Sequence, residues 1–294
     1  SHRIASHRIA SHRIASHPTS PRTTISLSLA PLPQLLASLG GAAASHSIYT
    51  KLDPEAVGSR AAQYVLSLGL DGLDVDLEGW GSDPNGRAYL TNLTLAARAE
   101  FEKRGPPPSP LLQHRSEAVP RAPPRMLISH APEVPDFWRG NPYERLLADP
   151  AVLDAIDFLN LQFYNQIPFP DQEHIFTKDV YPPAAGAPSC LASIVAATVA
   201  ASAGAVTATA VNQKLLLGFP CKDGSFPVGG ANLNQCGAAQ AQLVRTGVHA
   251  LGYPLRGVFE WSAAPPTLVP ADLIQWNDAM GKALGGDTPT NTMA

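Results

Sequence analysis

The most constraining feature of the sequence is the run from Asp71 to Glu78, in which three acids alternate with aliphatic residues. Successive side chains on a β-strand point to opposite faces, so Asp74, Asp76 and Glu78 would share one face. The intervening leucine and valine side chains would share the other face. Such a file of acids predicts a strand whose acidic face lines a closed barrel and whose apolar face is covered by helices.

The clustered acids also predict a particular chemistry. Neighbouring carboxylates in a low-dielectric site cannot all ionise cheaply, so at least one apparent pKa is raised. A carboxylic acid that stays protonated near neutral pH can act as a general acid on a glycosidic bond. Glu78 would lie at the C-terminal end of its strand, where barrel enzymes keep their reactive groups. The alternatives are an acidic surface strand or a cation site, although the glycine and glutamate positions do not fit an EF-hand loop.

The same run resembles the DGxDxDxE signature of glycoside hydrolase family 18, which contains chitinases and endo-β-N-acetylglucosaminidases. The resemblance implies an α/β fold of the (β/α)8 TIM-barrel type. It also implies that Glu78 is the proton donor, that Asp76 positions the N-acetyl group of the substrate, and that Asp74 exchanges a proton with Asp76. Asp71 and Trp80, at the two ends of the motif, are expected to contact the substrate.

Two further segments resemble strands of the same family. Residues 35–41 end in the SxGG pattern of its third strand, and residues 126–130 resemble its fifth. An Ala-Pro pair follows the second segment, which implies that Ala131 and Glu133 line the cleft. His130 is expected to pack or to line the cleft, because no nucleophile is paired with it. Phe137 and Trp138 could form a sugar platform or anchor the loop, and both interpretations stay open.

The string from Gln162 to Asn165 resembles the QxYN signature of the sixth strand in the plant- and fungal-type branch. The resemblance assigns Tyr164 a hydrogen bond to the N-acetyl group, and it assigns Gln162 and Asn165 to the sugar-binding subsite. A buried tyrosine network is the alternative. Residues 257–262 resemble the GVxxW end of the last strand, and Trp261 is expected to stack on a sugar ring. Trp276 is expected to pack in the core.

The organisation of the chain follows from composition and pattern. With 294 residues and a net charge of -3, the chain is expected to form one large α/β domain that binds neither nucleic acid nor membrane. Residues 1–24, which contain Ser-His-Arg-Ile-Ala three times, are expected to form a disordered tail. Residues 25–294 would form the barrel domain, with a strand at 25–29 and a proline-rich insertion at 105–124. The family places two strands before residue 35, so the barrel is expected to be incomplete or irregular at its N-terminus.

Helices are expected to alternate with the strands. Asp53 and Pro54 predict the start of a helix that extends to Leu68, with an inward stripe formed by residues 57, 61, 64, 65 and 68. Further helices are expected at 85–103 and 237–251. The uncharged stretch 180–213 is expected to form an alanine-rich outer helix and not a membrane span, because it is weakly apolar and interrupted by proline and glycine.

The resemblance implies hydrolysis of β-1,4-linked N-acetylglucosamine polymers by a substrate-assisted, retaining mechanism. The alternatives are an endo-β-N-acetylglucosaminidase that acts on N-glycans, a non-catalytic chitin-binding protein, and a truncated, inactive hydrolase. No metal or cofactor is expected, because no ligand cluster is apparent. We expect a secreted monomer whose partner is chitin or a related glycan. A disulfide between Cys221 and Cys236 is one possibility, since three cysteines permit one internal pair at most.

Overall fold

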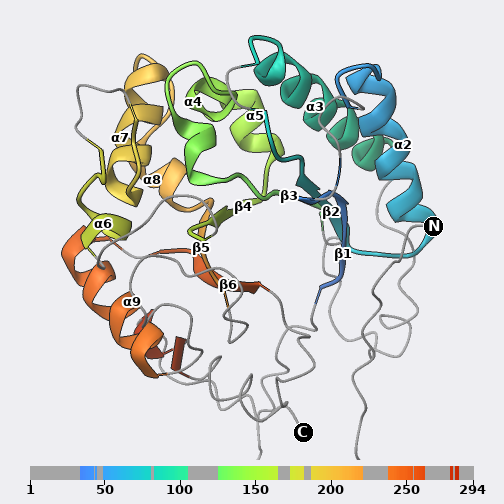
Figure 1. Ribbon diagram of the computed structural model, residues 1–294. Helices are drawn as coiled ribbons and strands as arrows, with labels where there is room; N and C mark the ends of the chain where they lie inside the picture. The colour runs from blue at the N-terminus through green and yellow to red at the C-terminus, as the bar shows by residue number, and fades with distance from the viewer. Residues whose placement is uncertain are drawn as a thin grey trace, which may run out of the picture.

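The protein is described by a computed structural model (Figure 1), which covers residues 34–42, 44, 49–80, 83–104, 125–164, 173–181, 187–220, 238–253, 255–261, 279–280 and 282–284. Several expectations lie outside these residues: the tail at 1–24, the strand at 25–29, the insertion at 105–124, the Cys221–Cys236 pair, Asn165 and Trp276.

A six-stranded parallel sheet forms the inner layer of the fold, and its strands follow one another in chain order. The strands are β1 (Leu36–Gly40), β2 (Gly72–Asp76), β3 (Leu127–His130), β4 (Phe158–Gln162), β5 (Leu215–Pro220) and β6 (Gly257–Trp261). Figure 1 shows them as a curved arc with the helices on its convex side. Parallel neighbours in chain order with helical crossovers are the (β/α) barrel arrangement, so the predicted fold class is confirmed.

The outer layer consists of helices that connect consecutive strands. They are α2 (Pro54–Ser67), α3 (Gly86–Arg104), α4 (Tyr143–Leu146), α5 (Pro150–Ala155), α6 (Glu173–Phe176), α7 (Leu191–Ala201), α8 (Ala208–Asn212), α9 (Ala238–Leu251) and the 3-10 helix η1 (Val134–Phe137). The core lies between these helices and the convex face of the sheet. Leu73 and Val75 of β2 and Leu77 beyond it are all buried there, which confirms the apolar face expected from the alternation.

Helix α2 begins as predicted, and its predicted inward stripe is correct in part, since Val65 is buried and Val57 and Ala61 pack against the core. The Asp53 side chain accepts a hydrogen bond from the backbone N–H of Glu55, and Pro54 occupies the first turn. The buried positions are 58, 62 and 65, whereas Tyr64 and Leu68 are about half exposed. The reason is Gly58, because a Cβ there would lie 2.1 Å from the carbonyl oxygen of Leu93. The missing side chain lets α2 and α3 pack closely along this face.

The alanine-rich segment forms two helices, α7 and α8, and not one. Helix α7 ends near Ser202, and the chain then turns through Ala203 and Gly204, both with positive φ (50° and 87°). Thr207 caps α8 by accepting a hydrogen bond from the N–H of Ala210. Both helices lie on the outside of the sheet, as expected (Figure 1). Within the described part of the chain, no helix combines the length and the apolar character needed to cross a membrane.

Candidate active site

Asp74, in the middle of β2, is held by side chains from three other strands. Its carboxylate accepts hydrogen bonds from Ser38 Oγ of β1 (2.8 Å), Ser129 Oγ of β3 (2.6 Å) and Asn160 Nδ2 of β4 (3.2 Å). The strand register places Ser38 and Ser129 directly beside Asp74. Burial raises the pKa of Asp74, and the three hydrogen bonds offset part of that rise. Asp74 is therefore a buried carboxyl group with a fixed orientation.

Asp76 and Glu78 form a close pair, as the alternation predicted. One amide nitrogen, Nε2 of Gln162, lies 3.2 Å from Asp76 Oδ1 and 3.2 Å from Glu78 Oε1. Burial raises the pKa of Asp76 to about 8, and the charges of Glu78 and Asp74 and a hydrogen bond with Glu78 add to the rise. A carboxyl group with this pKa keeps its proton near neutral pH, so the pair can deliver a proton to a bound molecule.

The end of β1 approaches the acid pair closely because of two glycines. Gly40 and Gly41 have φ values of 122° and 91°, which few other residues adopt. A Cβ on Gly40 would lie 2.0 Å from the carbonyl oxygen of Asp76. The N–H of Gly41 donates to that same oxygen at 2.6 Å. The SxGG pattern therefore fixes the backbone of Asp76 as well as supplying Ser38.

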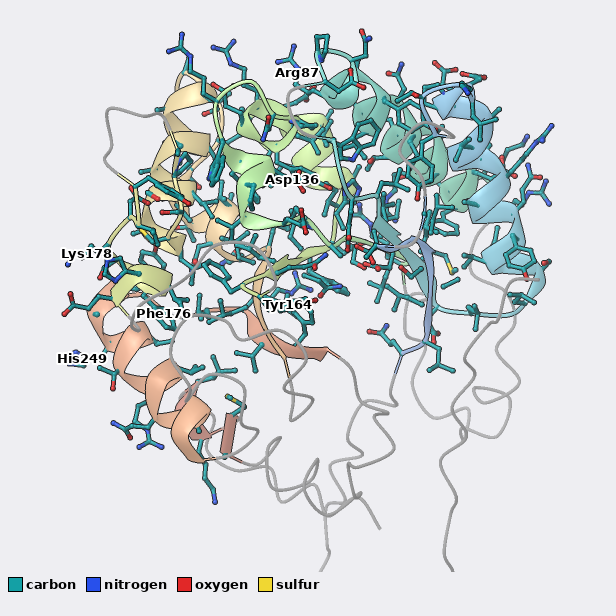
Figure 2. The ribbon with its side chains drawn as sticks, viewed as in Figure 1. Arg87, Asp136, Tyr164, Phe176, Lys178 and His249 are labelled. Carbon is teal, nitrogen blue, oxygen red and sulfur yellow. The ribbon has the colours of Figure 1, made fainter. Side chains whose placement is uncertain are left out.

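Tyr164 follows β4 and lies inside the arc of strands (Figure 2). Its side chain is buried, and burial together with the charges of Asp76 and Glu78 raises the pKa of its phenol well above the ordinary value. The phenol therefore stays protonated and can donate a hydrogen bond beside the acid pair. Gln162 and Tyr164 are thus both brought to the acids, as the resemblance implied.

Ala131 and Glu133 complete one side of the site. The carbonyl oxygen of Ala131 accepts a hydrogen bond of 2.8 Å from Gln162 Nε2, which orients the amide toward the acids. Glu133 forms an isolated parallel bridge with Gln162. Burial and the charge of Glu78 raise the pKa of Glu133. Both residues therefore lie next to the acid pair.

Several residues at the site were not predicted. Asp136 is buried in η1, its carboxylate accepts a hydrogen bond of 3.0 Å from the N–H of Glu133, and burial raises its pKa to about 7. The capping spacing of Glu133 and Asp136 is the sequence signal that could have indicated it. Ser38, Ser129 and Asn160 were also missed, because only the strand register shows that they face Asp74.

Some predicted site residues are not brought to the acids. Asp71 lies at the opposite end of β2, where its carboxylate accepts a hydrogen bond of 2.8 Å from the N–H of Leu35. Trp80 is buried against Tyr89, with ring centroids 5.4 Å apart, and donates to the carbonyl of Leu77. Trp261 is the last residue of β6, and its side chain is outside the described part. Asp71 and Trp80 therefore serve the fold in this structure.

The three residues that had been left open or interpreted as packing, His130, Phe137 and Trp138, are also placed. His130 is fully buried between Thr94 Oγ1 (3.0 Å) and the hydroxyl of Tyr143 (2.7 Å), on the helix side of the sheet. Burial lowers the pKa of His130 to about 3, so the ring is neutral. Phe137 is buried against Tyr143, which makes it a loop anchor. Trp138 is half-buried and packs edge-on against Tyr181.

The described residues contain no group of three or more His, Cys, Asp or Glu side chains arranged to hold a metal ion. The chemistry available to the site is that of a shared carboxyl proton, a second carboxylate next to it, and a phenol O–H donor. Such a set can protonate a leaving group while it orients a neutral amide.

No protein-family model matches the sequence, and no curated protein matches it either. Solved structures do resemble it. A family 18 chitinase from Pseudoalteromonas aurantia has a TM-score of 0.57 and 21% identity, and the match covers 85% of this chain and 75% of that one. Chitinase RmChi1 from Rhizomucor miehei has a TM-score of 0.50 and 16% identity, with coverage of 85% and 82%.

A third similar structure is YKL-39, which was solved in the presence of chitooligosaccharides. It has a TM-score of 0.50 and 12% identity, and the match covers 86% of this chain and 81% of that one. At these identities the likeness establishes the fold. Any activity must therefore be argued from the residues that line the acid pair.

Proposed function

We propose that the chain is a glycoside hydrolase of family 18 that cleaves β-1,4-linked N-acetylglucosamine polymers. The observation that carries the proposal is the Asp76–Glu78 pair, which one amide group of Gln162 contacts on both carboxylates. The DGxDxDxE run, the SxGG end and the QxYN string support the family. The QxYN string further supports its plant- and fungal-type branch.

In the first step of the proposed reaction, Glu78 protonates the glycosidic oxygen as the bond from that oxygen to the anomeric carbon breaks. The carbonyl oxygen of the substrate's own acetamido group forms the new bond to the anomeric carbon, which gives an oxazolinium-like intermediate and a free sugar hydroxyl. Asp76 accepts a hydrogen bond from the acetamido N–H and stabilises the developing positive charge. Tyr164 donates its O–H to the acetamido oxygen and so holds it below the anomeric carbon.

Asp74 influences this step through its neighbour Asp76. Because Asp74 is buried and fixed by three donors, its charge adds to the forces that keep a proton on the Asp76–Glu78 pair. When Asp76 turns toward the acetamido group, a proton shared with Asp74 keeps two adjacent charges from forming. Asp74 is therefore a positioning residue in this mechanism.

In the second step, Glu78 acts as a base. It takes a proton from water, and the water oxygen attacks the anomeric carbon while the bond to the acetamido oxygen breaks. Two inversions at one carbon give a product with retained configuration. The second step regenerates the proton on Glu78, so the cycle is complete without a further reactant.

The proposal extends to the rest of the molecule. We propose that residues 25–294 belong to one barrel domain, that the chain acts as a monomer, and that it is secreted, because chitin is an extracellular polymer. Ala131 and Glu133 would contact the sugar on the β3–β4 side. We further propose that Asn165 contacts the sugar and that Trp261 stacks on it.

The test is hydrolysis of a chromogenic N,N′-diacetylchitobioside by the wild type and by Glu78→Gln. Turnover is expected from the wild type and should fall by about a thousandfold or more in the variant, because the general acid is lost. Glu102→Gln is the matched control, since Glu102 is an exposed residue of α3 and its change should leave turnover intact. Proton NMR of the first product formed should show retained β-configuration.

Two results would contradict the proposal. A cooperatively folded wild type that binds chitooligosaccharides without cleaving them would indicate a binding protein. Equal turnover by the wild type and Glu78→Gln would show that Glu78 is not the general acid. Cleavage of an N-glycan core in place of chitobiosides would retain the mechanism and change the substrate.

A further inference from the structure

The side-chain amide of Gln162 faces three oxygen atoms at once. Its Nε2 lies 2.8 Å from the carbonyl oxygen of Ala131, 3.2 Å from Asp76 Oδ1 and 3.2 Å from Glu78 Oε1. The residue is buried, and its backbone N–H donates a hydrogen bond to the carbonyl of Pro132. The amide therefore approaches the acids from a fixed backbone.

The number of hydrogens on this nitrogen limits what the amide can do. An amide nitrogen carries two hydrogens, and the carbonyl of Ala131, which can only accept, takes one of them. One hydrogen is left for two carboxyl groups whose oxygens lie at the same distance from the nitrogen. If both groups were ionised, one of them would lack this donor. A proton on the pair removes the shortage, because the protonated acid can donate to its neighbour. The amide therefore matches a pair that carries one proton and one negative charge.

The surrounding ionisable groups increase the importance of this donor. The following acids and phenols interact with the charges of the pair: Asp74 on β2, Glu133 and Asp136 after β3, Tyr49 after β1 and Tyr164 after β4. Each of these groups is negative or neutral, so none offsets the charge of the pair as a cation would. Burial and the charges of Glu78, Asp74 and Glu133 raise the pKa of Asp76 to about 8. Loss of the amide hydrogen would therefore destabilise a charge that is already costly.

We propose that Gln162 is a positioning residue whose amide hydrogen stabilises the negative charge on the Asp76–Glu78 pair and so sets the pH range in which the proposed hydrolysis proceeds. The inference rests on the proposed function and gives Gln162 a role in the acid pair beyond its expected contact with the sugar. When the O–H bond of Glu78 breaks and the proton passes to the glycosidic oxygen, a negative charge forms on Glu78. The amide hydrogen already lies beside Glu78 Oε1 and stabilises that carboxylate.

Removing the amide should move the pH dependence of the reaction in one direction. Without the donor, each charged form of the pair is destabilised relative to the form with one more proton, so protons are held to higher pH. Both limbs of the bell-shaped profile of kcat/KM should therefore move to higher pH. A side chain that only contacted the sugar would change the height of the profile and leave its limbs in place.

The experiment compares Gln162→Met with the wild type. Methionine is unbranched and about as long as glutamine, but it has no amide hydrogen. NMR of isotope-labelled aspartate carboxyl groups in the sugar-free protein follows the titration of Asp76, whose signal is identified by its loss in Asp76→Asn. The Asp76 midpoint should rise by about one pH unit in Gln162→Met, the effect of one hydrogen bond to a charged group. The limbs of the kcat/KM profile with the chromogenic N,N′-diacetylchitobioside should move in the same direction.

Two further variants separate this effect from a change of fold. Gln162→Asn keeps an amide but withdraws it by one methylene, so the Asp76 midpoint should rise here too. Gln213→Met makes the matched substitution at an exposed residue that precedes β5, whereas Gln162 ends β4, so it lies toward the opposite ends of the strands. It should leave both the titration and the profile unchanged. Cooperative unfolding in urea identifies the variants that are folded.

The possible results distinguish this inference from the proposed function. An unchanged Asp76 midpoint in both Gln162 variants would overturn the inference and leave the proposed function intact. A profile that loses height while its limbs stay in place would also overturn it, because Gln162 would then act on the sugar alone. A raised midpoint in the variants of a chain that hydrolyses no chitobioside would support the link between the amide and the acids and overturn the proposed function.

Discussion

Replacing Asp76 with asparagine should stabilise the fold at neutral pH although it abolishes turnover. The pKa of Asp76 is raised from 3.8 to about 8, chiefly by burial and then by the charges of Glu78 and Asp74. At neutral pH the folded chain therefore keeps a proton that the unfolded chain has released. Asparagine has no carboxyl proton in either state. The variant therefore does not lose the stability that the wild type loses when only its unfolded chain releases this proton.

The magnitude follows from proton linkage. The folded pKa lies above the unfolded one, so stability is fully present below the unfolded value of 3.8 and is lost as the pH rises toward about 8. One pKa unit corresponds to about 1.4 kcal/mol, and the interval from 3.8 to neutral pH is about three units. The wild type should therefore lose about 4 kcal/mol at most across that interval, and the variant should not.

Urea unfolding followed by tryptophan fluorescence at acidic and neutral pH measures the effect. The Asp76→Asn variant should unfold at a higher urea concentration than the wild type at neutral pH, and the difference should shrink near pH ~4. Asp154→Asn is the control, because Asp154 is exposed on α5 and its change should give no such pH dependence. A difference between Asp76→Asn and the wild type that is equal at both pH values would refute the retained proton.

Three other changes separate chemistry from packing. Tyr164→Phe should lower kcat by about a hundredfold with little change in the unfolding midpoint, because it removes the donor to the acetamido oxygen; a kcat within twofold of wild type would exclude that role. His130→Gln should keep kcat within a few-fold but lower the free energy of unfolding by about 1–3 kcal/mol, because His130 bonds Thr94 and Tyr143 on the helix side; loss of turnover in a folded variant would contradict this. Gly58→Ala should destabilise by about 1–3 kcal/mol in urea unfolding, since its Cβ would meet the Leu93 carbonyl at 2.1 Å, whereas Ala61→Ser, on the less buried face of α2, should have a small effect.

The sequence predicted the acidic strand well because strict alternation has one simple structural solution. Asp74, Asp76 and Glu78 could share a buried face only if helices covered the leucine and valine face, and that required a sheet with helices outside it. Gln162 and Tyr164 were found by the same two-residue spacing. These are local patterns, which one segment carries by itself.

The features that the sequence could not predict depend on contacts between segments that lie far apart in the chain. The roles of Ser38 and Ser129 follow from the register of β1 and β3 against β2, which no single segment encodes. The stripe of α2 was predicted only in part, because a glycine, which carries no hydrophobic signal, makes the closest helix contact. Trp80 was expected at the sugar because it follows the acids, but its ring turns back to Tyr89 and the core.

The three donors to Asp74 have a consequence for how the chain folds. A parallel strand that slips by one residue turns every side chain to the opposite face of the sheet. A slip of β1 or β3 would carry Ser38 or Ser129 away from Asp74 and leave a buried carboxyl group short of a donor. Asn160 imposes the same requirement on the alignment of β4, because it also donates to Asp74. The hydrogen bonds of this one acid therefore depend on the alignment of four strands. A misaligned sheet would be destabilised by the loss of donors to the same group on which the proposed proton transfer depends.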